Sequence, residues 1–231
     1  MARIVLADDG IRFDGTTLTN RPLGGVETSV ILLVRELARR DPDMARLFKA
    51  AALPDLRSRS TGYGTIMKII SGQQVSTAAA RAINGRMEAV ANPMTPEVFT
   101  KLSDNDLRAI GFSRQKMSYG RAIAAAVLAG EFSFRRVARM EDEAAISEMI
   151  KLRGVGRWTA EVYLLFALRR PDIWPVDDLG IVIGMQGLKG LKDRPDKNAM
   201  IEYGEAWRPL RSVAARMLWH YVDCSRRGLI P

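Results

Sequence analysis

The sequence predicts an all-α protein of 231 residues, and three observations support this fold class. Apolar residues recur with the helical period of about 3.6 residues along most of the chain. The alternation of every second residue that marks a half-buried strand is nearly absent. The hydrophobic fraction is 47%, which is enough to bury a core and excludes a disordered or fibrous chain.

N-cap residues, proline and glycine mark the ends of the helices that we expect in the first half of the chain. Thr28 and Asp43 precede the first two, and Pro96 opens a short turn. Ser103 is the candidate cap of the next helix, and Gly111 ends it. The ranges expected to be helical are 28–40, 44–51, 63–71, 75–90, 104–110 and 114–129.

The helical pattern continues in the second half. Residues 141–152 place acids in a first turn, where the helix dipole favours them. An apolar helix then starts at Trp158 and ends before Pro171. Residues 1–25 form a separate N-terminal segment, read either as a hairpin with its strands in residues 3–13 or as a disordered terminus. Further helices are expected near 179–187, 197–206 and 210–225.

The chain is basic, with 35 Lys and Arg against 26 Asp and Glu and a formal net charge of +9. This excess favours a polyanionic partner, nucleic acid before an anionic membrane surface, although a basic surface without a partner explains the charge equally well. Residues 107–140 hold seven basic residues and one acid, which predicts a phosphate-facing surface, with a solvated helix face as the alternative. The seven are Arg108, Arg114, Lys116, Arg121, Arg135, Arg136 and Arg139.

Cys224 and His220 are the only cysteine and histidine. An internal disulfide, a Cys/His zinc site and a four-cysteine iron–sulfur cluster are therefore excluded. Neither a signal-peptide layout nor a membrane-spanning apolar run is present in the sequence. We therefore expect a soluble protein of a reducing, intracellular compartment.

The segment LRGVGR at residues 152–157 predicts a tight turn between two helices. Gly154 and Gly156 permit left-handed backbone angles and let N–H groups come close to a ligand. The N–H groups that open the following helix form an anion site, and Arg153 and Arg157 flank it with positive charge. The pattern indicates a clamp for a phosphate backbone that reads no base sequence, although a plain helix end followed by a new helix would look alike.

Asp177 and Asp178 open the apolar helix that begins in VDDLGI. In the simplest interpretation one acid caps the helix and the other complements its dipole. A carboxylate beside a basic surface can also stabilise positive charge that develops on a sugar.

With these motifs, the chain resembles the helix-hairpin-helix (HhH-GPD) DNA glycosylase superfamily and, within it, the 3-methyladenine DNA glycosylase II (AlkA-type) branch. The resemblance covers residues 30–225. It implies two helical lobes around a cleft, one from residues 26–70 plus 179–231 and one from 71–178, with the DNA-binding helix-hairpin-helix at 149–162. The motifs that carry it, in the family's order, are ISGQQVS at 70–76, LRAIGFSRQK at 107–116, LRGVGRWTA at 152–160, VDDLGI at 176–181 and WRPLRSVAARMLWHY at 207–221.

The resemblance also implies roles for single residues. Asp178 falls on the family's catalytic aspartate, which leaves Asp177 a capping role. Trp158 stands where the glycosylase/lyase members carry a nucleophilic lysine, so no Schiff base can form and no lyase activity is expected. Trp158 and Trp219 match aromatic positions of the base pocket, and Tyr163 lies next to the position of a third.

Gln74 falls where the family inserts a side chain into the gap left by the flipped nucleotide, with Gln73 as the fallback. The resemblance implies no cofactor for catalysis and no iron–sulfur cluster. It implies a monovalent Na or K ion on the hairpin carbonyls of Ile150, Leu152 and Val155. The residues expected to contact DNA phosphates are Arg153, Gly154, Gly156, Arg157, Thr159, Arg114 and Lys116.

These expectations describe a monofunctional DNA glycosylase of base excision repair, which hydrolyses the N-glycosidic bond of 3-methyladenine or 7-methylguanine-type bases in damaged duplex DNA. Such bases are cationic and leave without protonation, so one carboxylate suffices. Tryptophan faces attract them by ~0.5–2 kcal/mol. The alternatives are a glycosylase for deaminated or oxidised purines and a non-catalytic helix-hairpin-helix DNA-binding protein. We expect a monomer in the cytoplasm, associated with the nucleoid through DNA and with no membrane.

Overall fold

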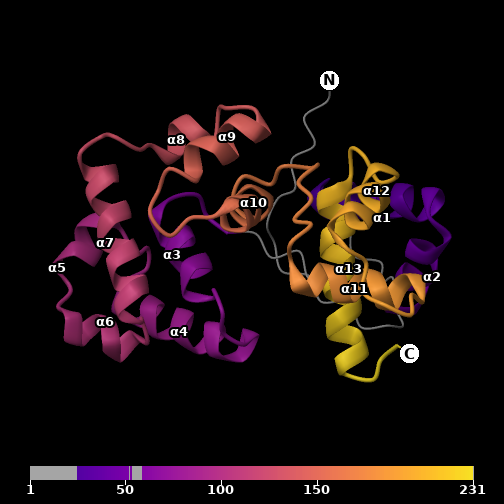
Figure 1. The fold of residues 1–231 in the computed structure, drawn as a ribbon, viewed down its shortest axis with the longest axis horizontal. Coiled ribbons are helices and arrows are strands. Elements are labelled where there is room, and N and C mark those ends of the chain that lie inside the picture. The colour runs from indigo at the N-terminus through magenta and orange to yellow at the C-terminus, as the bar shows by residue number, and fades with distance from the viewer. Residues whose placement is uncertain (1–24, 52, 54–58, 231) are drawn as a thin grey trace. The chain divides into compact units, whose positions relative to one another are not determined.

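The computed structural model describes residues 25–51, 53 and 59–230, and each regular element within those ranges is a helix (Figure 1). The all-α class is therefore confirmed for this part of the chain. The predicted hairpin at residues 3–13 lies outside the described residues. The helices are α1 (Gly25–Arg40), α2 (Pro42–Ala51), α3 (Tyr63–Ser71), α4 (Thr77–Val90), α5 (Pro96–Lys101), α6 (Asp104–Ile110), α7 (Arg114–Leu128), α8 (Phe134–Val137), α9 (Asp142–Met149), α10 (Arg157–Phe166), α11 (Leu179–Lys189), α12 (Lys197–Glu205) and α13 (Arg211–Arg226).

The chain divides into two compact units. The discontinuous unit combines residues 1–58 with 169–231, and the continuous unit comprises residues 59–168. The sequence predicted the breaks later, after residues 70 and 178. The first break comes earlier because α3 packs against α4, α7 and α10 and so joins the continuous unit, and the second falls after Leu168.

In the discontinuous unit, α11 and α13 lie side by side (Figure 1). A glycine allows this close approach, because a Cβ at Gly184 of α11 would lie 2.6 Å from the carbonyl oxygen of Leu218 on α13. Helix α2 packs on both α11 and α13. The segment before the continuous unit and the segment after it thus share one core, to which Leu37, Met44, Met185 and Leu218 contribute fully buried side chains.

Asp41, between α1 and α2, ties these segments together. Its Oδ2 accepts hydrogen bonds from Lys189 Nζ at 2.7 Å and from Trp207 Nε1 at 2.9 Å. Its Oδ1 accepts the backbone N–H of Asp43, in the first turn of α2, at 2.8 Å. A single buried carboxylate therefore links the start of α2 to the end of α11 and to the α12–α13 connection.

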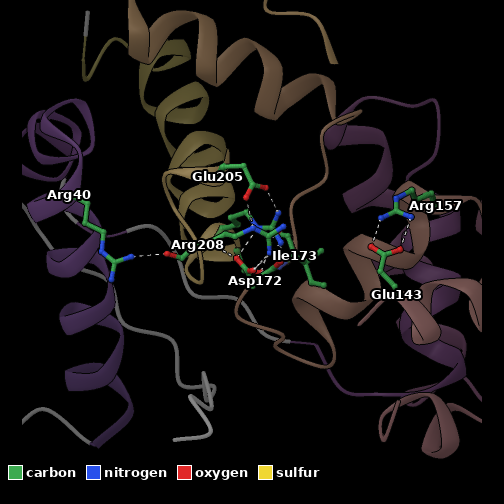
Figure 2. Close-up of polar contacts among 9 residues, drawn as sticks. Arg40, Glu143, Arg157, Asp172, Ile173, Glu205 and Arg208 are labelled. Carbon is green, nitrogen blue, oxygen red and sulfur yellow. Dashed lines mark hydrogen bonds and ion pairs between the residues drawn. The ribbon is translucent and has the colours of Figure 1, made fainter. Parts of the chain in front are cut away.

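A second polar link in the discontinuous unit runs through Arg208 (Figure 2). Arg40 Nη1 donates to the carbonyl oxygen of Arg208 at 2.7 Å. The guanidinium of Arg208 in turn donates to Asp172 Oδ2 at 3.0 Å and to Glu205 Oε2 at 2.7 Å. The end of α1 is thereby joined to the connection that precedes α13.

The core of the continuous unit is centred on Phe99 of α5, which has no exposed surface. Its ring meets Tyr63 edge-on at 5.6 Å and Phe112 at 5.9 Å between centroids. A Cβ at Gly120 of α7 would overlap the Phe99 ring and lie 2.8 Å from Met67 Cε, so only glycine lets α7 pack this closely on α5.

Several predicted helix ends are confirmed. Ser103 caps α6 and forms a capping box with Asp106, and Gly111 ends that helix in the left-handed region with φ of 109°. Pro96, expected to open a turn, instead starts the short helix α5. Within the described residues, no helix is long and apolar enough to cross a membrane.

Candidate functional site

Asp178 lies in the discontinuous unit as the N-cap of α11 and is 8% exposed. Its Oδ1 accepts the backbone N–H of Ile181 at 2.9 Å, which is the usual capping bond. The same oxygen accepts the indole N–H of Trp219, from α13, at 2.9 Å. The start of one helix and the side chain of a second therefore fix the orientation of this carboxylate.

This geometry corrects the roles assigned to the two aspartates. The cap is Asp178, not Asp177. Asp177 is half exposed and pairs with Lys197 Nζ at 2.9 Å. The sequence could not separate them because either acid of the pair can cap a helix that starts one residue later.

Gly180 is a residue of this site that the sequence reasoning missed. A Cβ at Gly180 would lie 2.9 Å from Trp219 Cδ1 and 3.0 Å from Asp178 Oδ1. The missing side chain therefore lets the edge of the indole reach the carboxylate. A glycine in the first turn of an apolar helix, where helix propensity disfavours it, was the available signal.

The predicted hairpin is present in the continuous unit, where α9 and α10 are joined by residues 150–156. Gly154 has φ of +85°, and a Cβ there would overlap the ring of Tyr119 from α7, so this position requires glycine. Gly156 is the N-cap of α10 with φ of −89°, and a Cβ there would meet no atom within 4 Å. The space beside the first turn of α10 is therefore open at Gly156.

Arg157, which the sequence predicts to contact a DNA phosphate, pairs with two carboxylates in the structure. Its Nη1 and Nη2 donate to both oxygens of Glu143 at 3.0 and 2.6 Å (Figure 2). Its Nε donates to Glu161 Oε1 at 2.9 Å. The hydrogen bonds to Glu143, and the charge of Glu161, raise the pKa of Arg157 above its ordinary value. Its charge is balanced within the hairpin, whereas the side chain of Arg153 is exposed.

Two further residues expected at the phosphates are also used inside the continuous unit. Thr159 is 2% exposed, and its Oγ1 accepts a hydrogen bond from Gln73 Nε2 at 2.9 Å. Lys116 Nζ donates to the carbonyl oxygens of Ser71 and Gln73, each at 2.8 Å. Burial lowers the pKa of Lys116 below its ordinary value. Both side chains hold the protein's own backbone and loops together.

The two glutamines of ISGQQVS differ clearly. Gln73 is half-buried and also donates from Nε2 to the carbonyl oxygen of Gly154 at 3.1 Å. Gln74 is exposed and has φ of 56°, in the left-handed region that non-glycine residues rarely occupy. Gln74, the first choice from the sequence, is therefore the glutamine with the exposed side chain.

The basic surface of residues 107–140 is partly neutralised. Arg121 pairs with Asp104 at 2.6 Å, and Arg108 lies 3.9 Å from the same carboxylate. Arg136 pairs with Glu148 at 2.8 Å. Of the seven basic residues in 107–140, all of which the structure describes, the exposed ones for which no ion pair is seen are Arg114, Arg135 and Arg139.

The aromatic residues assigned to a base pocket fall into different environments. Trp219 contacts Asp178 as described, and Trp158 is half-buried in the first turn of α10. Tyr163 has no exposed surface, and its hydroxyl accepts the backbone N–H of Gly62 at 2.7 Å. Burial raises the pKa of Tyr163 to about 12. The structure corrects this assignment, because Tyr163 is a core residue of the continuous unit.

The hairpin carbonyls offer oxygen ligands of the kind that alkali cations prefer. Leu152 O accepts the N–H of Val155 at 3.1 Å, which leaves this carbonyl one lone pair. Within the described residues, no group of three or more His, Cys, Asp and Glu side chains could hold a metal ion. Any ion at the hairpin would therefore be held by the backbone.

Comparison with known proteins places this geometry in a family. The family model described as HhH-GPD superfamily base excision DNA repair protein matches residues 67–209. DNA-3-methyladenine glycosylase 1 of Schizosaccharomyces pombe is 34% identical over 161 residues, which are 68% of this chain and 71% of that protein. The putative DNA-3-methyladenine glycosylase YfjP of Bacillus subtilis is 30% identical over 169 residues, which are 70% of this chain and 59% of that protein.

A solved structure agrees with these sequence matches. The Schizosaccharomyces pombe 3-methyladenine DNA glycosylase Mag1, in complex with abasic DNA, is similar with a TM-score of 0.77 and 28% identity. The match covers 87% of this chain and 99% of that chain. The chain belongs to the HhH-GPD superfamily of base excision DNA repair proteins.

Proposed function

We propose that the protein is a monofunctional DNA glycosylase that removes 3-methyladenine and 7-methylguanine-type bases from duplex DNA. The observation that carries the proposal is the carboxylate of Asp178, fixed by the N–H of Ile181 and the indole of Trp219. The names of the relatives, which are DNA-3-methyladenine glycosylases, support alkylated bases as the substrate class.

The chemistry follows from the charge of the substrate. A base alkylated at a ring nitrogen carries a positive charge, so the electrons of the glycosidic bond neutralise it as it leaves. The sugar is left with oxocarbenium character, and a carboxylate aligned in advance stabilises it with little reorganisation. Water then adds to the sugar carbon and loses a proton, which leaves an abasic site. Asp178 serves as the electrostatic partner of the sugar and orients this water.

Trp219, beside Asp178, is proposed to bind the base. The electron-rich face of its indole attracts a cationic ring more than a neutral one, which favours alkylated over normal bases. Because Trp158 replaces the lysine of the lyase members, we expect no covalent enzyme–DNA adduct. Borohydride reduction during the reaction should therefore trap no complex.

The continuous unit is proposed to hold the DNA. The N–H groups at the start of α10 and the exposed Arg153 and Arg114 bind phosphates, while Gln74 fills the gap left by the flipped nucleotide. We propose that the protein does this as a monomer.

The test is the release of free base from methylated duplex DNA by Asp178→Asn. Asparagine is as good a cap as aspartate, so this variant keeps the start of α11 and removes only the charge. We expect base release to fall at least about 100-fold with DNA affinity unchanged. The matched control is Asp177→Asn, which should keep full activity. Comparable release by Asp178→Asn and the wild type would disprove the assignment of Asp178.

We also propose a Na or K ion on the carbonyls of Ile150, Leu152 and Val155. Bound there, the ion would add positive charge to the hairpin and attract DNA phosphates. Duplex affinity measured at equal ionic strength in potassium and in tetramethylammonium chloride tests this. Equal affinity in the two salts would exclude the ion.

A further inference from the structure

The loop between α3 and α4, residues 72–76, carries Gln74 in an unfavourable conformation. Its φ of 56° is left-handed, which costs energy in a residue that has a Cβ. Such a conformation persists only when surrounding contacts impose it. Residues 72–76 are named the wedge loop, and two sets of contacts hold this loop in place.

Gln73 supplies the first contact. Its Nε2 donates to the carbonyl oxygen of Gly154 at 3.1 Å and to Thr159 Oγ1 at 2.9 Å. Gly154 belongs to the hairpin turn and Thr159 to the first turn of α10. The side-chain amide of Gln73, the residue directly before Gln74, is therefore bonded both to the hairpin turn and to the first turn of α10.

Helix α7 supplies the second contact. Lys116 Nζ donates to the carbonyl oxygens of Ser71 and Gln73, both at 2.8 Å, and so grips the backbone on the N-terminal side of Gln74. Tyr119, which follows on the same helix, lies with its ring against Gly154. The same face of α7 thus supports the wedge loop and the hairpin turn.

We propose that Gln73 and Lys116 are positioning residues for base flipping. They hold Gln74 in the conformation needed for insertion. They also connect it to the hairpin, so that phosphate binding by the hairpin and insertion of Gln74 into the base stack occur together. The inference rests on the proposed function, with Gln74 as the inserted residue. Neither Gln73 nor Lys116 needs to touch the DNA.

The role predicts a dependence on base pairing that a general structural role does not. Extruding a paired base costs more than extruding one that is already unpaired. A wedge prepared in advance therefore matters for a paired lesion and little for an unpaired one. The informative quantity is the rate of base release from the paired lesion divided by the rate from the unpaired lesion. We call this quotient the pairing ratio.

The experiment measures single-turnover release of 7-methylguanine from a fully paired duplex and from a duplex in which the lesion lies in a one-nucleotide bulge. For Gln73→Ala and Lys116→Met, we expect release from the paired duplex to fall about tenfold, while release from the bulge changes less than about twofold. Equal losses on both substrates would overturn the proposal.

A double-mutant comparison isolates the coupling to Gln74. Gln74→Ala alone should lower the pairing ratio, and adding Gln73→Ala to it should lower the ratio no further, because there is no wedge left to position. Additive losses would overturn the proposal. An unchanged ratio in Gln74→Ala, with base release intact, would overturn the wedge and its support but leave the glycosylase standing. No release by the wild type from either substrate would instead refute the proposed function.

Matched controls separate positioning from stability. Lys68→Met removes an ion pair with Glu88 in the same unit, and Gln186→Ala removes a glutamine bond to the carbonyl oxygen of Lys192. Both should leave the pairing ratio at its wild-type value. If Gln73→Ala does not fold, Gln73→Met has a similar volume and no donor, and its pairing ratio decides between the same outcomes.

Discussion

One oxygen of Asp178, Oδ1, accepts two hydrogen bonds that together fix the carboxylate. The capping bond to Ile181 fixes the carboxylate to the start of α11, and the bond from Trp219 fixes it to α13. Because α11 and α13 pack closely along their length, the carboxylate is aligned by the core of the discontinuous unit. The proposed catalytic group is therefore rigid without any dedicated loop.

The indole N–H of Trp219 can be tested separately from its ring. Trp219→Phe keeps an aromatic face and removes the donor that orients Asp178. We expect base release to fall about tenfold because a small misalignment of a catalytic group is costly. Affinity for duplex DNA should not change. Single-turnover rates and DNA titrations measure the two quantities, and full activity in this variant would show that Ile181 alone suffices to align the carboxylate.

Two substitutions of equal size at Gly156 test the anion site, because they differ only in charge. Its φ of −89° and the open space around its Cβ position allow other residues. Gly156→Asp and Gly156→Asn add side chains of equal size, and only the first adds a negative charge. We expect Gly156→Asp to bind duplex DNA about tenfold more weakly than Gly156→Asn at low salt, with the difference shrinking as salt rises. Equal affinities would remove this helix start from the interface.

At the scale of the element, the ion pairs of the hairpin serve its folding. Arg157→Gln removes a cation beside Glu161, whose side chain is only 5% exposed. We expect this change to lower the free energy of unfolding by about 1–3 kcal/mol. Glu143→Gln is the matched control, because that partner is 72% exposed and should matter by under about 1 kcal/mol. Urea unfolding measures both, and a loss of DNA affinity by Arg157→Gln without a loss of stability would restore Arg157 to the phosphate site.

The sequence predicted elements better than it predicted the partners of charged side chains. Helix periodicity and local caps located α6 and its end at Gly111, because those signals involve residues close in sequence. The engagement of Arg121 by Asp104 and of Lys116 by the wedge loop joins separate helices. Residue type and spacing carry no signal for such contacts, which is why the basic cluster seemed more available to DNA than it is.

At the scale of the whole molecule, Asp41 makes stability depend on pH. Burial alone would raise the pKa of this carboxyl, but hydrogen bonds from Lys189 and Trp207 outweigh burial and hold the pKa below its usual 3.8. Ionised Asp41 therefore stabilises the fold above about pH 4. That contribution is lost as the pH falls through the lowered native value.

We expect Asp41→Asn to lower the free energy of unfolding at pH 7 by about 1–3 kcal/mol, because Lys189 loses one of its two carboxylate partners and keeps only Asp43. Its stability should also fall less than that of the wild type as the pH drops below about 4, because this variant lacks the carboxyl whose protonation removes the contribution. Urea titrations across this range provide the measurement. Asp223→Asn, at an exposed ion pair with Arg227, is the control and should resemble the wild type. Parallel pH curves for wild type and Asp41→Asn would contradict the prediction.

The discontinuous unit also sets the order in which the protein can assemble during synthesis. Helices α1 and α2 leave the ribosome before the continuous unit, but α2 packs on α11 and α13, which emerge after it. The sequence of the continuous unit is complete before then, and domains generally fold as units during synthesis. Asp178 and Trp219 are 41 residues apart and meet only when α13 is complete. A nascent chain can therefore form its hairpin and wedge loop before it acquires the carboxylate site, so the capacity to cut a glycosidic bond arises later than the hairpin.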